Sequence, residues 1–166
     1  QLLDTKCTRK QSELLQKTHH LFVLMFLLRG LPFVDLAYIQ KKDLNGNILT
    51  YHRRKTGRQI TITVTKDAMN IIREYMDTTT ESPYLFPILS NFHKTEQQKV
   101  NRIHKIIAKV NKSLKEIGER LNIPIDLTTY VARHSFATVL KRSGVNTFLI
   151  CEALGHSSER VTQIYL

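Results

Sequence analysis

The carboxy-terminal part of the chain reads YVARHSFAT over residues 130–138 and LGHS over residues 154–157, and Tyr165 follows nine residues after the histidine of the second stretch. Apolar residues recur at helical spacing around these stretches, and Gly144 and Gly155 stand where two of the patterns stop. Glycine often ends a helix because it adopts left-handed backbone angles without strain. The pattern predicts helices over residues 129–142, 146–154 and 158–166, the last capped by Ser157.

The amino-terminal part predicts a buried helix followed by a small sheet. Residues 9–28 have helical spacing, and their second half is apolar on nearly every face, so we expect a buried helix that stops at Gly30. A short helix over residues 32–38 opens with proline in its first turn. Between residues 39 and 65 apolar and polar residues alternate, and Asn45-Gly46 is a turn signal. We expect antiparallel strands over residues 48–53 and 59–64, joined by a turn at residues 55–57.

The middle of the chain predicts two helices separated by a loop. Helical spacing covers residues 67–76 and again residues 95–121, and two prolines mark the segment between them as a loop or hinge. Thr95 and Gln98 form a capping-box pattern at the start of the long helix. We therefore expect an α+β fold, mainly α with a small antiparallel β-hairpin sheet, in one domain over residues 1–166.

Length, composition and charge restrict the class of protein. The chain has 166 residues, 42% of them hydrophobic, which is enough to form a folded core. Lys and Arg number 25 and Asp and Glu 14, so the formal net charge is +11, spread through the sequence. We expect a polyanion as the partner, ahead of an anionic membrane surface or an acidic protein. The longest apolar run, residues 21–28, is far shorter than the roughly 20 residues that span a bilayer, so we expect no membrane segment.

The cysteines and the chain ends give two further expectations. Cys7 and Cys151 form no Cys-x-x-Cys pair, so we interpret both as reduced thiols in a cytoplasm-like compartment. The sequence begins at Gln1 instead of Met and stops at Leu166 directly after a helical pattern, so we expect a fragment of a larger protein.

Two groups of basic residues are candidates for contact with phosphate. Residues 41–66 hold seven basic residues and one acid, which concentrates positive charge at the tip of the predicted hairpin. On the long helix, basic residues recur at spacings of three and four on a face away from the apolar stripe. A solvated surface explains that face equally well. The candidate phosphate contacts are Arg53, Arg54, Arg58, Arg102, Lys105 and Lys109.

Taken together, the motifs resemble the catalytic domain of the tyrosine recombinase (phage integrase) family. The family signature is an arginine, a lysine on a hairpin, His-x-x-Arg, Leu-Gly-His or Leu-Gly-Trp, and a tyrosine nine residues later. Arg29 follows a buried helix, as the first arginine of the family does, and Lys55 lies on the predicted hairpin. Tyr130 departs from the pattern, because the family has histidine there. The resemblance implies six catalytic residues: Arg29, Lys55, Tyr130, Arg133, His156 and, as the nucleophile, Tyr165.

The chemistry of these residue types supports the same assignment. A tyrosine hydroxyl has a pKa of about 10, so about 0.1% is phenolate at pH 7, a handicap of about 4 kcal/mol that nearby cations relieve. Our hypothesis is that Tyr165 attacks a DNA phosphate and forms a 3′-phosphotyrosyl intermediate. Arg29, Arg133 and His156 hold that phosphate and stabilise the charge that develops on it. Lys55 protonates the departing 5′ oxygen as a general acid.

Several neighbouring residues are given non-catalytic roles. A phenol is a poor base at neutral pH, so Tyr130 is assigned to orientation and the general base is left open. Asp35 and Glu152 are interpreted as salt-bridge partners of the catalytic arginines. His134 is interpreted as structural, because the residue next to Arg133 on a helix points about 100° away.

The resemblance also predicts partners and setting. The expected partner is double-stranded DNA, in DNA integration or inversion, without membrane contact, in a bacterial, nucleoid-associated cytoplasmic location. We expect no metal or other cofactor, because the sequence has no carboxylate cluster like that of two-metal nucleases. The intact enzyme would add an amino-terminal DNA-clamping domain and act as a tetramer on paired sites, whereas this chain alone would be a monomer.

Two alternatives remain open from the sequence. The chain could be a non-catalytic helical DNA-binding regulator, with the glycine turns between its last helices forming a helix-turn-helix. It could also be a recombinase fold whose chemistry has decayed, with Tyr130 as the sign of that loss.

Overall fold

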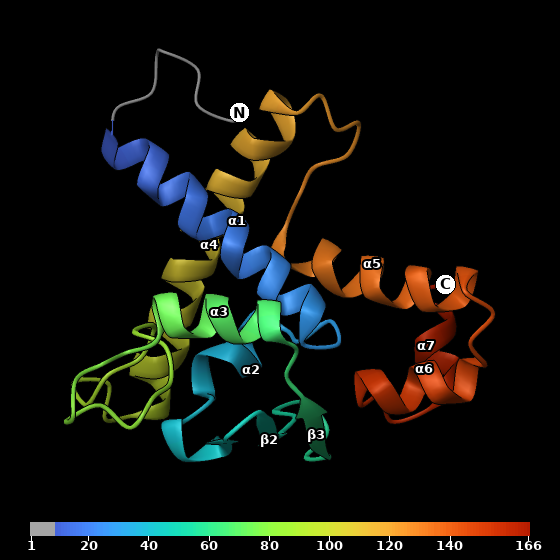
Figure 1. Ribbon diagram of the computed structural model, residues 1–166, viewed down its shortest axis with the longest axis horizontal. Helices are drawn as coiled ribbons and strands as arrows, with labels where there is room; N and C mark the ends of the chain where they lie inside the picture. The colour runs from blue at the N-terminus through green and yellow to red at the C-terminus, as the bar shows by residue number, and fades with distance from the viewer. Residues whose placement is uncertain (1–8) are drawn as a thin grey trace.

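The computed structural model describes residues 9–166, and it is mainly helical with one small sheet (Figure 1). Among these residues the elements follow in the order α1 (Arg9–Leu27), α2 (Phe33–Tyr38), a 3-10 turn (Lys41–Asp43), β1 (Leu44–Asn45), β2 (Ile48–His52), β3 (Gln59–Thr63), α3 (Lys66–Tyr75), α4 (Glu96–Arg120), α5 (Thr129–Arg142), α6 (Thr147–Leu154) and α7 (Glu159–Gln163).

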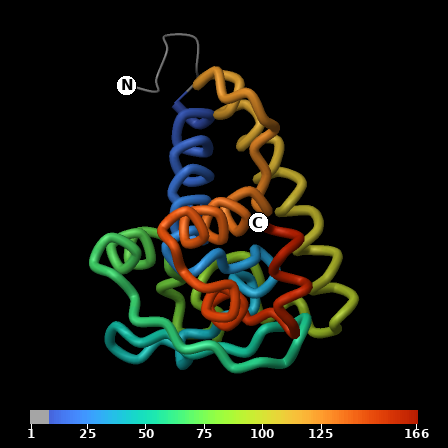
Figure 2. Tube along the Cα trace, turned by 90° about the vertical axis from the view of Figure 1, so that its right-hand side faces the viewer, coloured from blue at the N-terminus to red at the C-terminus, as the bar shows by residue number. Residues whose placement is uncertain are grey.

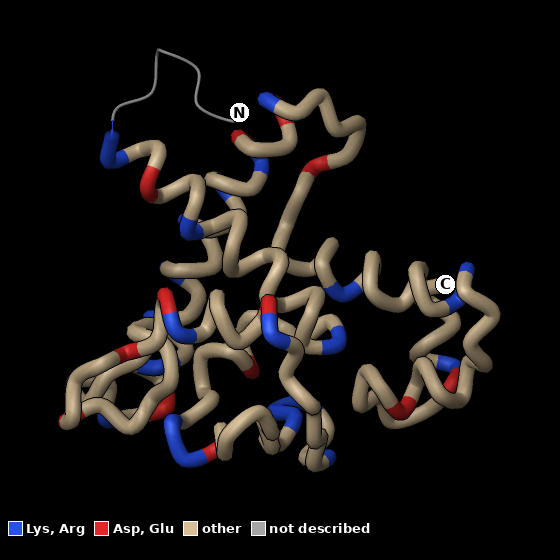
Figure 3. Tube along the Cα trace, viewed as in Figure 1, with Lys and Arg blue, Asp and Glu red and all other residues tan. Residues whose placement is uncertain are grey.

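Helix α1 is the centre of the main core. It runs diagonally through the molecule and packs against α3, α4 and α5 (Figure 1). Leu24 and Met25 are completely buried, as the apolar second half of this helix predicts. Helix α4 presents Ile103, Val110 and Leu114 to the same core, at helical spacing. The basic residues, in contrast, lie along the whole chain (Figure 3).

The sheet has three antiparallel strands in the order β1-β2-β3. The register pairs Leu49 with Ile62 and Tyr51 with Ile60, and all four side chains are buried on one face. Thr50 pairs with Thr61 on the other face. Because successive side chains of a strand point to opposite faces, the alternating pattern of the sequence sets this register.

The last three helices form a smaller unit beside the hairpin that joins β2 and β3. Ala137, Ile150 and Leu154 make a second buried cluster, and Tyr165 packs against its edge. Figure 2 shows α6 and α7 above the end of the sheet. The contact is direct, because Thr56 in the hairpin donates a hydrogen bond to Gly155 O over 3.2 Å.

The predicted helices and strands are confirmed, with differences at their ends. The capping box of Thr95 and Gln98 is present at the start of α4. Helix α2 begins at Phe33, because Pro32 is its N-cap instead of its first helical residue. The last helix is shorter than predicted, and its N-cap is Ser158, whose side chain makes no capping hydrogen bond, so the prediction of a Ser157 cap was wrong.

Two remaining expectations concern cysteines and membranes. Cys151 is a buried free thiol, whereas Cys7 lies outside the described residues. Within residues 9–166, no helix has both the length and the apolar character that crossing a bilayer requires.

Gly155 lies where α6 turns toward α7, and a side chain there is expected to destabilise the fold. Its φ is +63°, and a Cβ would lie 2.5 Å from Cδ1 of Ile60 and 3.0 Å from Cγ of Arg53. We expect Gly155→Ala to lower the free energy of unfolding by about 3 kcal/mol, since backbone strain and overpacking add. The measurement is urea denaturation.

Gly144→Ala is the matched control. Gly144 also follows a helix with positive φ, +78°, but nothing lies within 4 Å of its Cβ position. It should lose only the conformational part, about 1 kcal/mol. Equal losses in the two variants would show that the contact between α6 and the hairpin is loose.

Candidate active site

Arg133 joins two distant parts of the chain. It lies in α5 and is only 2% exposed. Its Nη1 donates to Gly30 O over 2.8 Å, and its Nη2 donates to Leu154 O over 2.7 Å. Burial lowers the pKa of Arg133, and the nearby charge of Arg53 lowers it further. Arginine stays protonated despite such shifts, so a fixed positive charge lies inside the fold.

The turn after α1 positions Arg29 close to this charge. Arg29 and Gly30 have φ values of +59° and +65°, two successive left-handed residues that reverse the chain. A Cβ at Gly30 would lie 3.0 Å from the Arg133 Cα, so only glycine fits there without displacement. Arg29 itself is exposed, unlike Leu28 before it. Arg29 is therefore a cation at the edge of the core, where it follows the buried end of α1.

Tyr51 shows that three arginines share one neighbourhood. The side chain is 6% exposed, and burial raises the pKa of its hydroxyl, as does the carboxylate of Asp35. Positive charges act on the pKa of the same hydroxyl in the opposite direction, from Arg53, Arg133 and Arg29. These cations come from the hairpin, α5 and the turn after α1, yet they act on one point of the fold.

Arg53 is an internal residue, which differs from its expected place on a DNA-facing surface. Its guanidinium forms a buried ion pair with Asp35 of α2. The other carboxylate oxygen of Asp35 accepts from the backbone N–H of Arg54 over 3.0 Å. The expected acidic partner is therefore present, but it pairs with Arg53 instead of Arg29 or Arg133. A buried charge is costly without such a partner, so the pair fixes the base of the hairpin.

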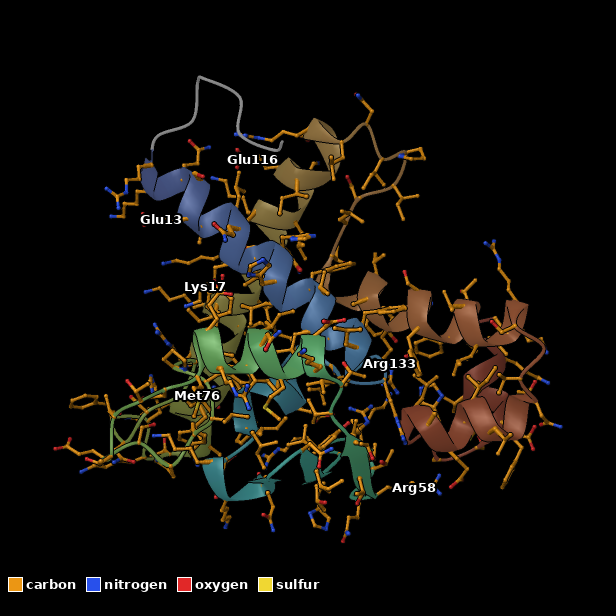
Figure 4. All side chains as sticks on the ribbon, in the orientation of Figure 1. Glu13, Lys17, Arg58, Met76, Glu116 and Arg133 are labelled. Carbon is orange, nitrogen blue, oxygen red and sulfur yellow. The ribbon has the colours of Figure 1, made fainter. Side chains whose placement is uncertain are left out.

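Arg58 and Thr56 attach the hairpin to the carboxy-terminal helices. Arg58 donates to His156 O over 2.7 Å and pairs with Glu152 at 2.7 Å. Figure 4 shows Arg58 beside the sheet, near α6, and Arg133 near the end of α1. Glu152 is the salt-bridge residue that the sequence indicates, although its partner is Arg58. Between these anchors, Lys55 is exposed, and its charge reaches His156 and lowers the pKa of that imidazole.

His156 is a buried, neutral imidazole beside the cations. It is 4% exposed, and its Nδ1 lies 2.9 Å from Thr162 Oγ1. Burial, and then the charges of Arg133, Arg53 and Lys55, lower its pKa from 6.5 to about 4. At pH 7 the ring is therefore uncharged and carries a single N–H.

Tyr165 lies among these groups. Its ring centroid is 4.8 Å from that of His156 and 5.7 Å from Cζ of Arg133. Its hydroxyl is hydrogen-bonded to the hydroxyl of Tyr130. Burial and this hydrogen bond raise the pKa of Tyr130 to about 12. Tyr130 is therefore protonated at pH 7, and its hydroxyl can donate to the oxygen of Tyr165.

His134 is part of this aromatic group, although the sequence argument interpreted it as structural. Its ring stacks on Tyr165, with centroids 4.4 Å apart and planes at 25°. It also meets the edge of Tyr130 at 4.8 Å. The signal was available, because residues 130 and 134 are four apart and share one face of a helix. The direction of His134 relative to Arg133 does not predict this contact, whereas its spacing from Tyr130 does.

The candidate DNA contacts on α4 are not part of this group. Arg102 donates to Ile88 O over 3.1 Å, and Lys105 is exposed. Arg102 and Lys109 line an apolar cavity of about 230 Å³ with residues of α1 and α3, and none of the six catalytic candidates lines it. On the hairpin side, Arg54 pairs with Glu96 at 3.0 Å.

Unpartnered nitrogens mark the centre of the site. Among the described residues, four buried side-chain atoms have no hydrogen-bond partner: Arg53 Nε, Arg133 Nε, His156 Nε2 and Ser82 Oγ. Three of the four belong to the two buried arginines and the histidine that lies beside them. The two Nε–H groups can only donate, so they are suited to an anion with several oxygens, such as a phosphate. No cluster of three or more metal-ligating side chains occurs within the described part.

Comparison with known families identifies the chain. The model described as the phage integrase family matches residues 1–166. The chain belongs to this family. Tyrosine recombinase XerA of Pyrococcus furiosus is 32% identical over 148 residues, which cover 87% of this chain and 48% of that protein. The chain therefore spans about half the length of the curated relatives that it matches.

Solved structures share the fold of this integrase-family chain. The crystal structure of XerA recombinase superposes with a TM-score of 0.63 at 20% identity, over 98% of this chain and 60% of that one. The Tn1549 transposon integrase, solved in complex with circular intermediate DNA, gives a TM-score of 0.55 at 20% identity, over 95% of this chain and 61% of that one. The predicted fold class is confirmed, and it is that of tyrosine recombinase catalytic domains.

The neutral state of His156 makes the stability of the fold pH-dependent. With a folded pKa of about 4 and an ordinary value of 6.5, the unfolded chain binds more protons at this residue between these pH values. The free energy of unfolding therefore falls as pH is lowered through this window. We expect His156 to account for a loss of about 2 kcal/mol between about pH 6.5 and about pH 4.5.

Urea denaturation across this pH range, with His156→Gln as the comparison, isolates that contribution. The pKa values of His19 and His134 are also lowered, but both residues remain in the variant and add to both curves. The slopes should differ by the contribution of His156. Parallel curves would mean that His156 titrates normally in the folded chain.

Proposed function

We propose that this chain is the catalytic domain of a site-specific tyrosine recombinase, which cleaves and rejoins DNA strands through a 3′-phosphotyrosyl intermediate. The observation that carries the proposal is the group of cations and unpartnered N–H donors around the hydroxyl-bearing ring of Tyr165. Family membership supports it over a non-catalytic regulator. The proposed domain covers residues 1–166, and the part of XerA that this chain matches is 48% of that relative's length.

In the proposed reaction, Oη of Tyr165 attacks the phosphorus of a DNA phosphodiester. A bond forms between that oxygen and phosphorus, and the bond from phosphorus to the 5′ oxygen breaks. Lys55 gives its proton to the departing 5′ oxygen, which leaves as a hydroxyl. Because the new ester keeps the energy of the broken bond, another 5′ hydroxyl can reverse the step, and no nucleotide cofactor is needed.

Arg29, Arg133 and His156 are the proposed phosphate ligands. Arg133 gives one N–H of each Nη to a backbone carbonyl, and its Nε–H, which has no partner, is proposed to donate to the phosphate. Arg29 is exposed and free to reach a DNA strand that approaches from outside. Donors fixed before the substrate arrives lower the barrier because they do not reorganise as charge develops.

Tyr130 is proposed to orient the nucleophile. Its hydroxyl is hydrogen-bonded to that of Tyr165, and a pKa of about 12 keeps it a donor at neutral pH. Donation to the Tyr165 oxygen orients that oxygen for attack on the phosphorus. Tyrosine in place of the family's histidine is thus compatible with catalysis, and it does not require decayed chemistry. The proton that Tyr165 loses on attack passes to water, and Lys55 regains one from water, so the step is balanced in protons.

Double-stranded DNA is the proposed partner, in integration or inversion. Tn1549 integrase, which shares this fold, was solved with circular intermediate DNA. Exposed cations near the site, Lys55 and Arg54, are proposed to contact the DNA backbone first, with Lys105 and Lys109 farther away. Arg53, Arg58 and Arg102 have internal partners, so they would support the surface from within. We further propose that this chain is a monomer on its own and that the whole protein acts as a tetramer on paired DNA sites. The proposed location is the bacterial nucleoid.

Covalent capture tests the proposed activity. The chain is incubated with a pool of nicked duplexes whose sequence around the nick is randomised, so that the short cleaved strand diffuses away and the ester accumulates. We expect an adduct that survives denaturant and maps to Tyr165 by peptide mass spectrometry. Tyr165→Phe should lose the adduct while it retains affinity for the pool. An adduct of equal yield in this variant would refute the assigned nucleophile.

The role of Lys55 has its own test, on the duplex sequence recovered from the pool. Lys55→Ala should slow adduct formation by about 10²–10⁴-fold, because the 5′ oxygen leaves without a proton. A substrate with sulfur at the bridging 5′ position should restore most of the rate, since a thiolate leaves unprotonated. Lys115→Ala is the control. Lys115 lies in the last part of α4 and pairs with Asp126 in the segment that follows that helix. A loss that persists on the sulfur substrate would assign Lys55 to DNA binding.

A further inference from the structure

Thr162 contacts both the proposed phosphate ligand and the proposed nucleophile. It lies in α7, three residues before Tyr165, and is completely buried. Its Oγ1 is 2.9 Å from Nδ1 of His156, and its carbonyl oxygen accepts from the backbone N–H of Tyr165 over 2.9 Å. One residue thus makes a hydrogen bond to each of the two groups.

The hydrogen bond to His156 decides which nitrogen of the ring carries the proton. A neutral imidazole has one N–H and one acceptor nitrogen, and the bond at one nitrogen selects the other's role. If Thr162 donates to Nδ1, then Nε2 carries hydrogen and is a donor. If Nδ1 donates to Thr162, then Nε2 is an acceptor and repels phosphate oxygens.

The surroundings favour donation by Thr162. Among the described residues, the Thr162 hydroxyl is hydrogen-bonded to His156 Nδ1 alone, so donation satisfies both the hydroxyl hydrogen and the Nδ1 lone pair. His156 Nε2 is buried without a partner, as are Nε of Arg133 and Nε of Arg53. An anion that meets those guanidinium donors would also accept from an Nε2–H.

We propose that Thr162 is a positioning residue, whose hydroxyl donates to His156 Nδ1 and so orients Nε2–H toward a non-bridging phosphate oxygen. The proposal rests on the proposed recombinase function. Because the same residue holds the backbone of Tyr165, it also sets the distance between the phosphate ligand and the nucleophile. Thr162 does not touch the phosphate in this scheme.

Two substitutions separate the hydroxyl from its bulk. Thr162→Val keeps the branched shape and removes the hydroxyl, whereas Thr162→Ser keeps the hydroxyl. On a nicked duplex captured by the chain, we expect Thr162→Val to slow adduct formation by about 10–100-fold, the size of effect seen when the residue that orients a metal-binding histidine is removed. Thr162→Ser should retain most of the rate of the unsubstituted chain, because it keeps the donating hydroxyl. Equal rates for all three proteins would overturn the proposal.

The tautomer is measured directly and without DNA. In the chain labelled with ¹⁵N-histidine, long-range proton–nitrogen spectra distinguish the protonated ring nitrogen from the bare one, and His156→Gln identifies the signals of His156. We expect Nε2–H at pH 7, with and without saturating inorganic phosphate, and a mixture of tautomers in Thr162→Val. A chain with Nδ1–H under both conditions would overturn the proposal, whatever the kinetics of the valine variant.

The two experiments keep this inference distinct from the proposed function. If the unsubstituted chain forms no adduct, the recombinase function fails, and the spectra still decide whether Thr162 sets the tautomer. If it forms an adduct and the valine variant matches it, only the inference fails. Circular dichroism of both variants shows whether they fold. If Thr162→Val does not fold, the tautomer in the unsubstituted chain and the rate of Thr162→Ser test the inference instead.

Discussion

The arrangement of the site depends on the hydrogen bonds that the buried guanidinium of Arg133 donates. It donates to a carbonyl at residue 30 and to one at residue 154, so it joins the turn after α1 to the end of α6. Charge-assisted hydrogen bonds of this kind are strong where water is excluded. Removal of the guanidinium would leave both carbonyls without these donors and would release the turn that carries Arg29. The cation is thus both a structural link and, in the proposed reaction, a phosphate ligand.

The hairpin is held from two sides, and this explains why many of its charges face inward. Asp35 binds Arg53 and the backbone of the next residue, while Arg58 reaches the backbone of His156. Arg53 and Arg58 therefore have internal partners, although the sequence predicts both as DNA contacts. Lys55, between the two anchors, is exposed and keeps its charge available. A general acid on a short hairpin needs such anchoring, because small displacements of a reacting group are costly.

The sequence predicts the elements well and the partners of individual charges poorly, for a physical reason. Periods of 3.6 and 2 residues are local, so α1, α4 and the pairing of β2 with β3 follow from apolar spacing alone. Which carboxylate meets which arginine depends on tertiary packing, so Asp35 was expected beside Arg29 or Arg133 and lies beside Arg53. His134 is different: its contact with Tyr130, four residues earlier on α5, could be predicted from the sequence, whereas its stacking on Tyr165, beyond the end of α7, depends on tertiary packing.

The balance of charge explains why a neutral histidine belongs in such a basic site. Arg133, Arg53 and Lys55 all lower the pKa of His156, and a further cation there would repel each of them. Asp35 already offsets Arg53, so the site keeps enough positive charge for a phosphate that becomes more negative as it is attacked. An uncharged N–H adds a directed hydrogen bond without adding repulsion. That contribution depends on the proton being on the nitrogen that faces the phosphate, and a hydroxyl on the opposite side of the ring can keep it there.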